Sequence, residues 1–378
     1  MTKNLATAIS EFGARAKAKL SSAAIDGAPE DQLRNPLEQL FHDLAELSGL
    51  PPKALNLVGE TDLKHLKTRP DFAVTRNNAL IGFVEIKAPG KGADPRKFEK
   101  GSHDGEQWEK LKSLPNLIYS DGGSFSLWRD GKLEGAIVQL DGDIETSGAK
   151  LTGPETLLLL ISSFFHWNPI PPNSAPKLAE VSARLCRLLR DEVVEQMELG
   201  NAGLTALAQD WRHLLFPTAD DAQFADGYAQ AVTFGLLVAR AQGIKLSKGI
   251  EPAAQELRKS NSLIGAALRI LTDDVENQKA LQTSLGTLTR VLDVVDWHLI
   301  SKDKPEAWLY FYEDFLEVYD NTLRKRTGSY YTPPEVVEAM VNLVDEALRS
   351  SLFERSNGFA SSDVWVADPS TGTGELTT

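Results

Sequence analysis

The clearest pattern near the start of the chain is an amphipathic helix that begins at about Asp31. Apolar side chains recur there every three or four residues, which places them on one helical face. The segment before it, from the N-terminus to about Leu20, also has a helical pattern and lacks the uninterrupted apolar core of a secretory signal. The apolar face of the Asp31 helix consists of Leu33, Leu37, Leu40, Phe41 and Leu44.

Alternation of the kind found in β-strands recurs only between this helix and about Leu140. Residues 71–75 and 80–87 predict a hairpin with Asn77 and Asn78 in its bend, because asparagine tolerates the backbone conformations of tight turns. A short helix is expected near residues 106–111. Two further strands are then predicted, at residues 116–120 and 124–129.

From about Gly153 to Asp320 the pattern is almost wholly helical and is interrupted by prolines at residues 169–172. Two apolar stripes in this region predict helices that face a core rather than a cofactor. The first stripe is Leu178, Val181, Leu185, Leu188 and Leu189, and the second is Phe224, Tyr228, Val232 and Leu236.

A third unit is expected near the end of the sequence. A helix is predicted over residues 334–348, followed by a strand over residues 363–368 that runs into a glycine-rich turn. A strand followed by such a turn is how a doubly wound α/β domain starts. Three domains are therefore predicted, over residues 1–150, 151–320 and 321–378.

Composition narrows the class of protein. The 378-residue chain has a formal net charge of -13, which argues against wholesale coating of nucleic acid. Residues 61–112 nevertheless carry 11 Lys or Arg against 8 Asp or Glu. The single Cys186 excludes an internal disulfide framework and fits a reducing cytoplasm, where we expect the protein to reside. The longest apolar stretch, residues 157–165, is about half of a bilayer span.

The predicted hairpin carries the residues with the clearest chemistry. Glu85 and Lys87 are two apart in a strand and project from the same face, and the hairpin would bring the carboxylate of Asp71 beside Glu85. Two carboxylates and the carbonyl of Ile86 could hold Mg²⁺ or Mn²⁺ through oxygen ligands. Such a metal activates water, and Lys87 could orient or deprotonate that water or neutralise charge on a phosphate. The alternative is an exposed strand edge on which Glu and Lys simply alternate with apolar residues.

Arg-Pro-Asp71, then 14 residues later Glu85-Ile-Lys87, followed by Ala-Pro-Gly90, resembles the signature of the PD-(D/E)xK nuclease superfamily. The resemblance covers about residues 30–135 and implies an α/β fold and a metal-dependent DNA endonuclease. It implies two further catalytic residues. Glu38 resembles the helix glutamate that many of these nucleases direct at the metal, or else it is a solvated helix residue. Gln107 resembles the glutamine of type I and type ISP nucleases, although Leu111 replaces the tyrosine that usually follows it.

Two later motifs resemble those of N6-adenine DNA methyltransferases. Tyr330-Tyr331-Thr332-Pro333 is similar to their motif X, and Asp368-Pro-Ser-Thr-Gly372-Thr-Gly374 is similar to their motif I. The resemblance implies a Rossmann-like domain that binds S-adenosylmethionine, because glycines let the backbone approach a ligand closely. The catalytic tetrapeptide of that family, Asn or Asp followed by Pro-Pro and an aromatic residue, does not occur. We therefore expect only the beginning of the domain here, and no methylation by this chain alone. The residues that this resemblance assigns to the cofactor are Tyr331, Thr332, Pro333, Asp368, Gly372 and Gly374.

The order of nuclease, helical spacer and adenine methyltransferase resembles type IIG restriction-modification enzymes, or type ISP enzymes, although the spacer contains no Walker A sequence. The resemblance implies double-stranded DNA as the substrate and a transient dimer on DNA. It also implies a second chain or domain that supplies the rest of the methyltransferase and the recognition domain. The alternative function is a catalytically silent module for DNA docking or assembly.

Overall fold

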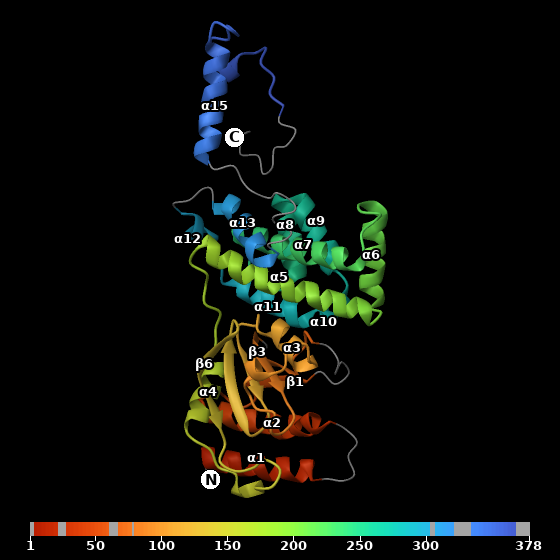
Figure 1. Cartoon of the computed structure of the whole chain (residues 1–378), viewed down its shortest axis with the longest axis vertical. Helices are drawn as coiled ribbons and strands as arrows, with labels where there is room; N and C mark the ends of the chain where they lie inside the picture. The colour runs from red at the N-terminus through yellow and green to blue at the C-terminus, as the bar shows by residue number, and fades with distance from the viewer. Residues whose placement is uncertain are drawn as a thin grey trace. The chain divides into compact units, whose positions relative to one another are not determined.

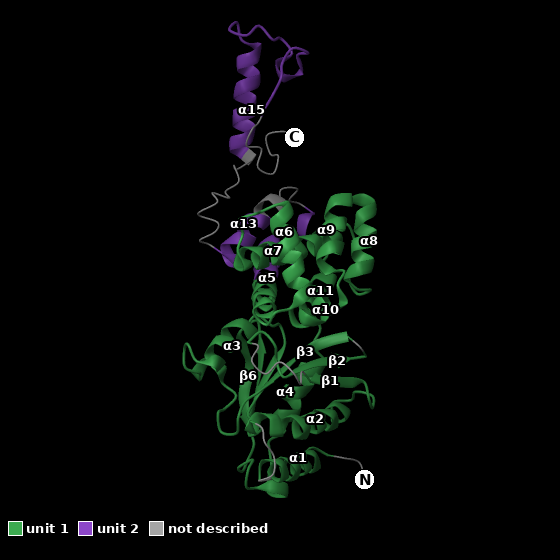
Figure 2. Ribbon diagram, turned by 90° about the vertical axis from the view of Figure 1, so that its right-hand side faces the viewer, with its two compact units in different colours: residues 1–171, 184–297 green, residues 172–183, 298–378 purple. Residues whose placement is uncertain are grey.

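A computed structural model describes residues 4–21, 28–59, 67–77, 79–302, 307–320 and 334–367. These residues fall into two compact units. The first comprises residues 1–171 and 184–297, and the second comprises residues 172–183 and 298–378 (Figure 2). The helices and strands of both units are labelled in Figure 1.

The first unit begins with the two predicted helices, α1 (Leu5–Leu20) and α2 (Pro29–Leu47). α1 starts at Asn4, whose side chain accepts a hydrogen bond from the amide of Thr7 and so satisfies one of the free donors of the first turn. Pro29 is well placed at the start of α2, because its missing N–H would be unpaired there in any case. All five apolar residues predicted for the α2 face are buried.

A six-stranded sheet follows, with its strands in sequence order. The strands β3 and β4 are parallel and all other neighbours are antiparallel, so the helix α3 crosses between β3 and β4. The β2–β3 pair is the predicted hairpin, with Asn77 at a φ of 51° in its bend. The elements are β1 (Leu55–Gly59), β2 (Phe72–Arg76), β3 (Ala79–Ile86), α3 (His103–Leu111), β4 (Leu117–Ser120), β5 (Ser124–Arg129) and β6 (Lys132–Gln139).

Each face of the sheet has its own apolar core. Val84 and Ile86 of β3 face the core that contains the buried sides of α1, α2 and α4 (Thr156–Phe165). Phe83 faces the other core, together with Trp108 of α3 and Tyr119 of β4. Because side chains alternate along a strand, the residues that follow Phe83 at intervals of two belong to the α3 face of the sheet.

The remainder of the first unit is helical, as the sequence predicts. The residues of the second apolar stripe are all buried in α7, and α7 begins with a capping box between Asp220 and Gln223. In the first stripe Leu178, Leu185, Leu188 and Leu189 are buried, whereas Val181 is half-buried. The helices are α5 (Ala175–Glu198), α6 (Ala202–Leu214), α7 (Asp221–Ala241), α8 (Ile250–Ser260), α9 (Ser262–Thr272), α10 (Val275–Ala280) and α11 (Gln282–Asp293).

The second unit contains the first turns of α5, most of α12 (Trp297–Ser301), and the helices α13 (Ala307–Tyr319) and α15 (Pro334–Arg349). The helix α15 confirms the prediction for residues 334–348. The strand predicted at residues 363–368 is wrong over its described part: residues 364–367 form no strand, and Trp365 is 93% exposed. A strand exists through hydrogen bonds to a neighbour, and the described residues of this unit contain no strand to pair with.

No helix within the described ranges has both the length and the apolar character needed to cross a membrane.

Candidate active site

The end of β3 carries the acid and the lysine. Glu85 and Lys87 follow Phe83 at intervals of two, so both side chains lie on the α3 face of the sheet, and both are buried. The amide of Lys87 donates to the carbonyl oxygen of Ser120 at 2.8 Å, which continues the parallel pairing with β4 by one residue. The pairing therefore fixes the backbone on which these two side chains stand.

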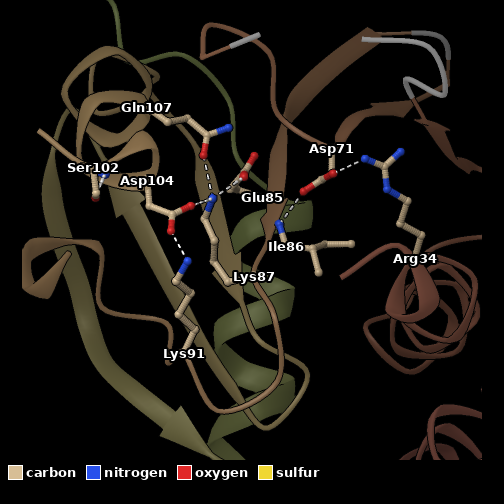
Figure 3. Close-up of polar contacts among 10 residues, drawn as sticks. Arg34, Asp71, Glu85, Ile86, Lys87, Lys91, Ser102, Asp104 and Gln107 are labelled. Carbon is tan, nitrogen blue, oxygen red and sulfur yellow. Dashed lines mark hydrogen bonds and ion pairs between the residues drawn. The ribbon is translucent and has the colours of Figure 1, made fainter. Parts of the chain in front are cut away.

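Asp71 reaches the same place from the neighbouring strand. Phe72 pairs with Val84, so one further step in this antiparallel register sets Asp71 opposite Glu85, on the same face. The Asp71 carboxylate accepts a hydrogen bond from the amide of Ile86 at 2.7 Å. Its other oxygen pairs with the guanidinium of Arg34 on α2. The hairpin thus brings the Asp71 and Glu85 carboxylates together, as Figure 3 shows.

Lys87 is held by three acceptors. Its Nζ donates to Glu85 Oε1 at 2.8 Å, to Asp104 Oδ1 at 2.8 Å and to Gln107 Oε1 at 2.6 Å (Figure 3). Asp104 and Gln107 are three residues apart on α3 and therefore lie on one face of that helix. The helix begins at Ser102, whose hydroxyl accepts from the amide of Gly105 at 3.1 Å. The crossover helix therefore supplies two of the three partners that fix the lysine.

Burial sets the protonation behaviour of these groups. It raises the pKa of Glu85 to about 8, and the nearby charge of Asp71 adds to the rise, while Lys87 opposes it. Burial also raises the pKa of Asp71, against the effects of Arg34 and the Ile86 amide. Burial alone would lower the pKa of Lys87, but Glu85 and Asp104 together raise it above its usual value. Lys87 is therefore a firmly charged donor beside two carboxylates that are costly to ionise.

These side chains line a pocket of about 140 Å³. Of the residues predicted from sequence for the nuclease site, Asp71, Glu85, Ile86, Lys87 and Gln107 all line it. Glu38 is half-buried on α2 and is not among the lining residues. Glu38 lies eight positions after Glu30 on α2, which is about 12 Å along the helix axis, and Glu30 does line the pocket.

Sequence reasoning therefore missed residues that α2 and α3 bring to the pocket. Glu30 lines the pocket, and burial and the charge of Asp71 raise the pKa of its carboxyl, against the effect of Lys87. Asp104 pairs with both Lys87 and Lys91. Helical spacing from Gln107 could have revealed Asp104, whereas nothing in the local pattern distinguishes Glu30 from an ordinary first-turn acid.

The donors around Glu85 suit a hard cation. Glu85 Oε2 is buried and makes no hydrogen bond of ordinary geometry with a described residue, although the Gln107 side chain lies close enough to lower the pKa of Glu85. The amides of Phe83 and Lys87 face β4, so the amide and the carbonyl of Ile86 face the Asp71 side of β3. Glu85 Oε2 and the carbonyl oxygen of Ile86 are oxygen ligands of the kind that Mg²⁺ prefers. However, no cluster of three or more His, Cys, Asp or Glu side chains in the described part of the chain has the arrangement of a metal site. A cation here would depend on two carboxylates, a backbone carbonyl and water.

Comparison with known protein families gives a match at the other end of the chain. Residues 309–376 match the family model described as N-6 DNA Methylase, and S-adenosylmethionine is the methyl donor of that family. The six residues predicted to bind this cofactor, Tyr331, Thr332, Pro333, Asp368, Gly372 and Gly374, lie outside the described residues.

One solved structure is similar over nearly all of the chain. It is the cryo-EM structure of a DrdV–DNA complex, with 19% sequence identity and a TM-score of 0.37. The similarity covers 98% of this chain and 34% of that one, so this chain spans about a third of the length of that protein. No curated protein matches the sequence.

Proposed function

We propose that the sheet domain is a metal-dependent DNA endonuclease of the PD-(D/E)xK type, with Asp71, Glu85 and Lys87 as its catalytic residues. The observation that supports this most directly is the unpartnered, buried Glu85 Oε2 beside the Asp71 carboxylate in one pocket. A merely structural carboxylate at this depth would be expected to have hydrogen bonds on both oxygens. The unused oxygen supports the binding of a cation.

Mg²⁺ or Mn²⁺ would be held by Asp71, Glu85 and the carbonyl of Ile86, and when bound it would supply an activated water and stabilise charge on the phosphate. The side chains of this chain would do the rest. Lys87, kept charged by Glu85 and Asp104, would offset the negative charge that develops on the phosphate. Its three N–H groups are taken up by Glu85, Asp104 and Gln107, so it would orient the attacking water only after one of these acceptors is released. Gln107 would hold the lysine in place through its 2.6 Å hydrogen bond.

The biological setting that we propose is restriction-modification. A match to the N-6 DNA Methylase family in the same chain as a nuclease-like site supports a protein that both cuts and protects double-stranded DNA. In this proposal S-adenosylmethionine binds around the Tyr331–Pro333 turn and the Asp368–Gly374 loop. A second domain or chain supplies the catalytic tetrapeptide and the recognition of a DNA sequence, and transient dimers on DNA cut both strands.

The test is the nicking of a supercoiled plasmid by the full chain in Mg²⁺ or Mn²⁺, with and without S-adenosylmethionine. We expect the wild type to nick. Asp71→Ala and Lys87→Ala are each expected to lower the rate by at least about 100-fold, because removing one preorganised charge from such a site costs about 3 kcal/mol of transition-state stabilisation.

Asp210→Ala is the matched control, since Asp210 is exposed on α6 and does not line the pocket. It should nick like the wild type. A folded wild type that cuts in neither metal would refute the nuclease proposal and would leave the docking module as the better interpretation. Equal loss in all three variants would point to general damage rather than to this site, and undiminished nicking in Asp71→Ala and Lys87→Ala would point to a contaminating nuclease.

A further inference from the structure

Two buried carboxylates on α5 hold the segment that leads into Asp71. Glu192 Oε1 lies 3.3 Å from Arg69 Nε, and these side chains are 0% and 5% exposed. Glu195 Oε2 accepts hydrogen bonds from the amide of Thr68 at 3.2 Å and from its hydroxyl at 2.6 Å. Both contacts fall within three residues of Asp71, and all of these residues belong to the first unit.

The end of α10 and the start of α11 complete the first contact. The Arg69 guanidinium donates to the carbonyl oxygens of Lys279, at 3.2 Å, and of Ala280. Glu192 Oε2 accepts from the amide of Ser284 at 3.1 Å and from the hydroxyl of the same residue. Both oxygens of Glu192 therefore have partners, which is what a carboxylate at this depth requires.

Glu195 contacts two segments whose neighbouring residues line the pocket. Its Oε1 accepts from Lys110 Nζ at 2.6 Å, and Lys110 lies on α3, the helix whose Asp104 and Gln107 hold Lys87. Its other oxygen holds Thr68, on the side of Asp71. Because Glu192 and Glu195 are three apart, they lie on one face of α5 and act on the same region.

A short stretch of backbone connects these contacts to the site. A single residue separates Arg69 from Asp71, so their Cα atoms are at most about 7 Å apart. That residue is Pro70, whose ring fixes φ and removes one degree of freedom from this stretch. A displacement of Arg69 therefore moves the Asp71 carboxylate instead of being absorbed along the way. Catalytic and metal-binding geometry tolerates displacements of only about 0.5 Å.

A contribution to folding stability does not by itself explain the buried charged contacts of Glu192 and Glu195. A buried ion pair often contributes less than well-packed apolar residues of similar size, because desolvation offsets the attraction. Burial raises the pKa of Glu192 to about 7 in spite of Arg69, which shows how costly the charge is. A geometric role explains why charged side chains stand here.

We propose that Glu192 and Glu195 are positioning residues, through which the helical layer sets the placement of Asp71 and of the α3 residues that hold Lys87. This inference rests on the proposed nuclease site. It makes the spacer helices part of the active-site architecture, so that a rearrangement of α5 against the sheet would switch the site between competent and incompetent geometries.

The experiment measures Mn²⁺ binding by electron paramagnetic resonance and plasmid nicking over a Mn²⁺ titration, both on the full chain. The variants are Glu192→Gln and Glu195→Gln. Glu198→Gln is the matched control, because Glu198 is exposed on the same helix. Glutamine keeps the size of the side chain but turns an NH₂ group toward Arg69 or Lys110. We expect the Mn²⁺ dissociation constant to rise at least about five-fold in both variants and to be unchanged in the control.

Thr68→Val is a milder variant in case the glutamines do not fold. It removes one hydroxyl donor to Glu195 and leaves the backbone donor in place, and we expect a two- to three-fold rise in the dissociation constant. A merely structural role would lower the unfolding midpoint and leave the Mn²⁺ affinity of the folded protein unchanged, and that result would overturn the proposal. So would equal weakening in Glu198→Gln.

The two proposals fail in different ways. A wild type that binds Mn²⁺ but does not nick DNA would refute the nuclease, while the affinities of the variants would still decide the positioning role. A wild type that binds no Mn²⁺ would overturn both.

Discussion

Glu85→Gln is expected to stabilise the protein in the absence of metal. Folding raises the pKa of this carboxyl from its usual 4.5 to about 8, mainly through burial. At about 1.4 kcal/mol for each pKa unit, the ionised carboxylate costs on the order of 5 kcal/mol of folding free energy. The variant loses the ion pair with Lys87, which keeps Asp104 and Gln107 as partners. We therefore expect a net gain of roughly 1–3 kcal/mol.

The effect has a definite dependence on pH. Between pH 4.5 and 8 the folded protein binds more protons at Glu85 than the unfolded chain does, so this group makes the wild type less stable as pH rises through that window. The advantage of Glu85→Gln should be close to zero below pH 4.5 and largest above pH 8. Urea unfolding in EDTA at pH 5, 7 and 8.5, with Glu198→Gln as a control, measures it.

Metal should reverse the order of stability. A cation that binds the folded site stabilises the wild type by mass action and leaves Glu85→Gln almost unaffected. Adding Mn²⁺ at pH 8.5 should therefore raise the unfolding free energy of the wild type alone. A variant that is less stable than the wild type in EDTA at pH 8.5, or a difference that does not change with pH, would refute the argument from burial.

Three further predictions test the scaffold and the composition of the pocket. Gly82→Ala places a β-carbon 2.5 Å from the carbonyl oxygen of Asn116, and we expect a loss of about 2–3 kcal/mol in urea unfolding. Asn116→Ala removes the side-chain amide that donates to the buried carbonyl oxygens of Ile81 and Phe164. The free energy of unfolding is expected to fall by about 2–3 kcal/mol, and an unchanged value would contradict this role of the amide. Glu30→Gln should raise the Mn²⁺ concentration for half-maximal nicking more than Glu38→Gln does, and the opposite order would restore the assignment made from sequence.

The sequence by itself determined the local elements and the central pair of the candidate site. Alternation and turn chemistry indicated the β2–β3 hairpin, and strand periodicity put Glu85 and Lys87 on one face. These features depend on neighbours two to four residues apart, which is the range over which a residue pattern carries information. Gln107 was predicted from its resemblance to the glutamine of type I and type ISP nucleases and not from periodicity.

Residues from distant segments were decided only by tertiary packing. The packing of α2 against the sheet determines which turn of the helix lies next to the end of β3. That turn carries Glu30 and not Glu38, so Glu30 lines the pocket. The contacts of Glu192 and Glu195 with residues 68 and 69 span more than 120 positions of sequence, and no local pattern encodes such a pairing. The strand expected at residues 363–368 shows the same limit, since a strand needs a partner and periodicity cannot show whether one is there.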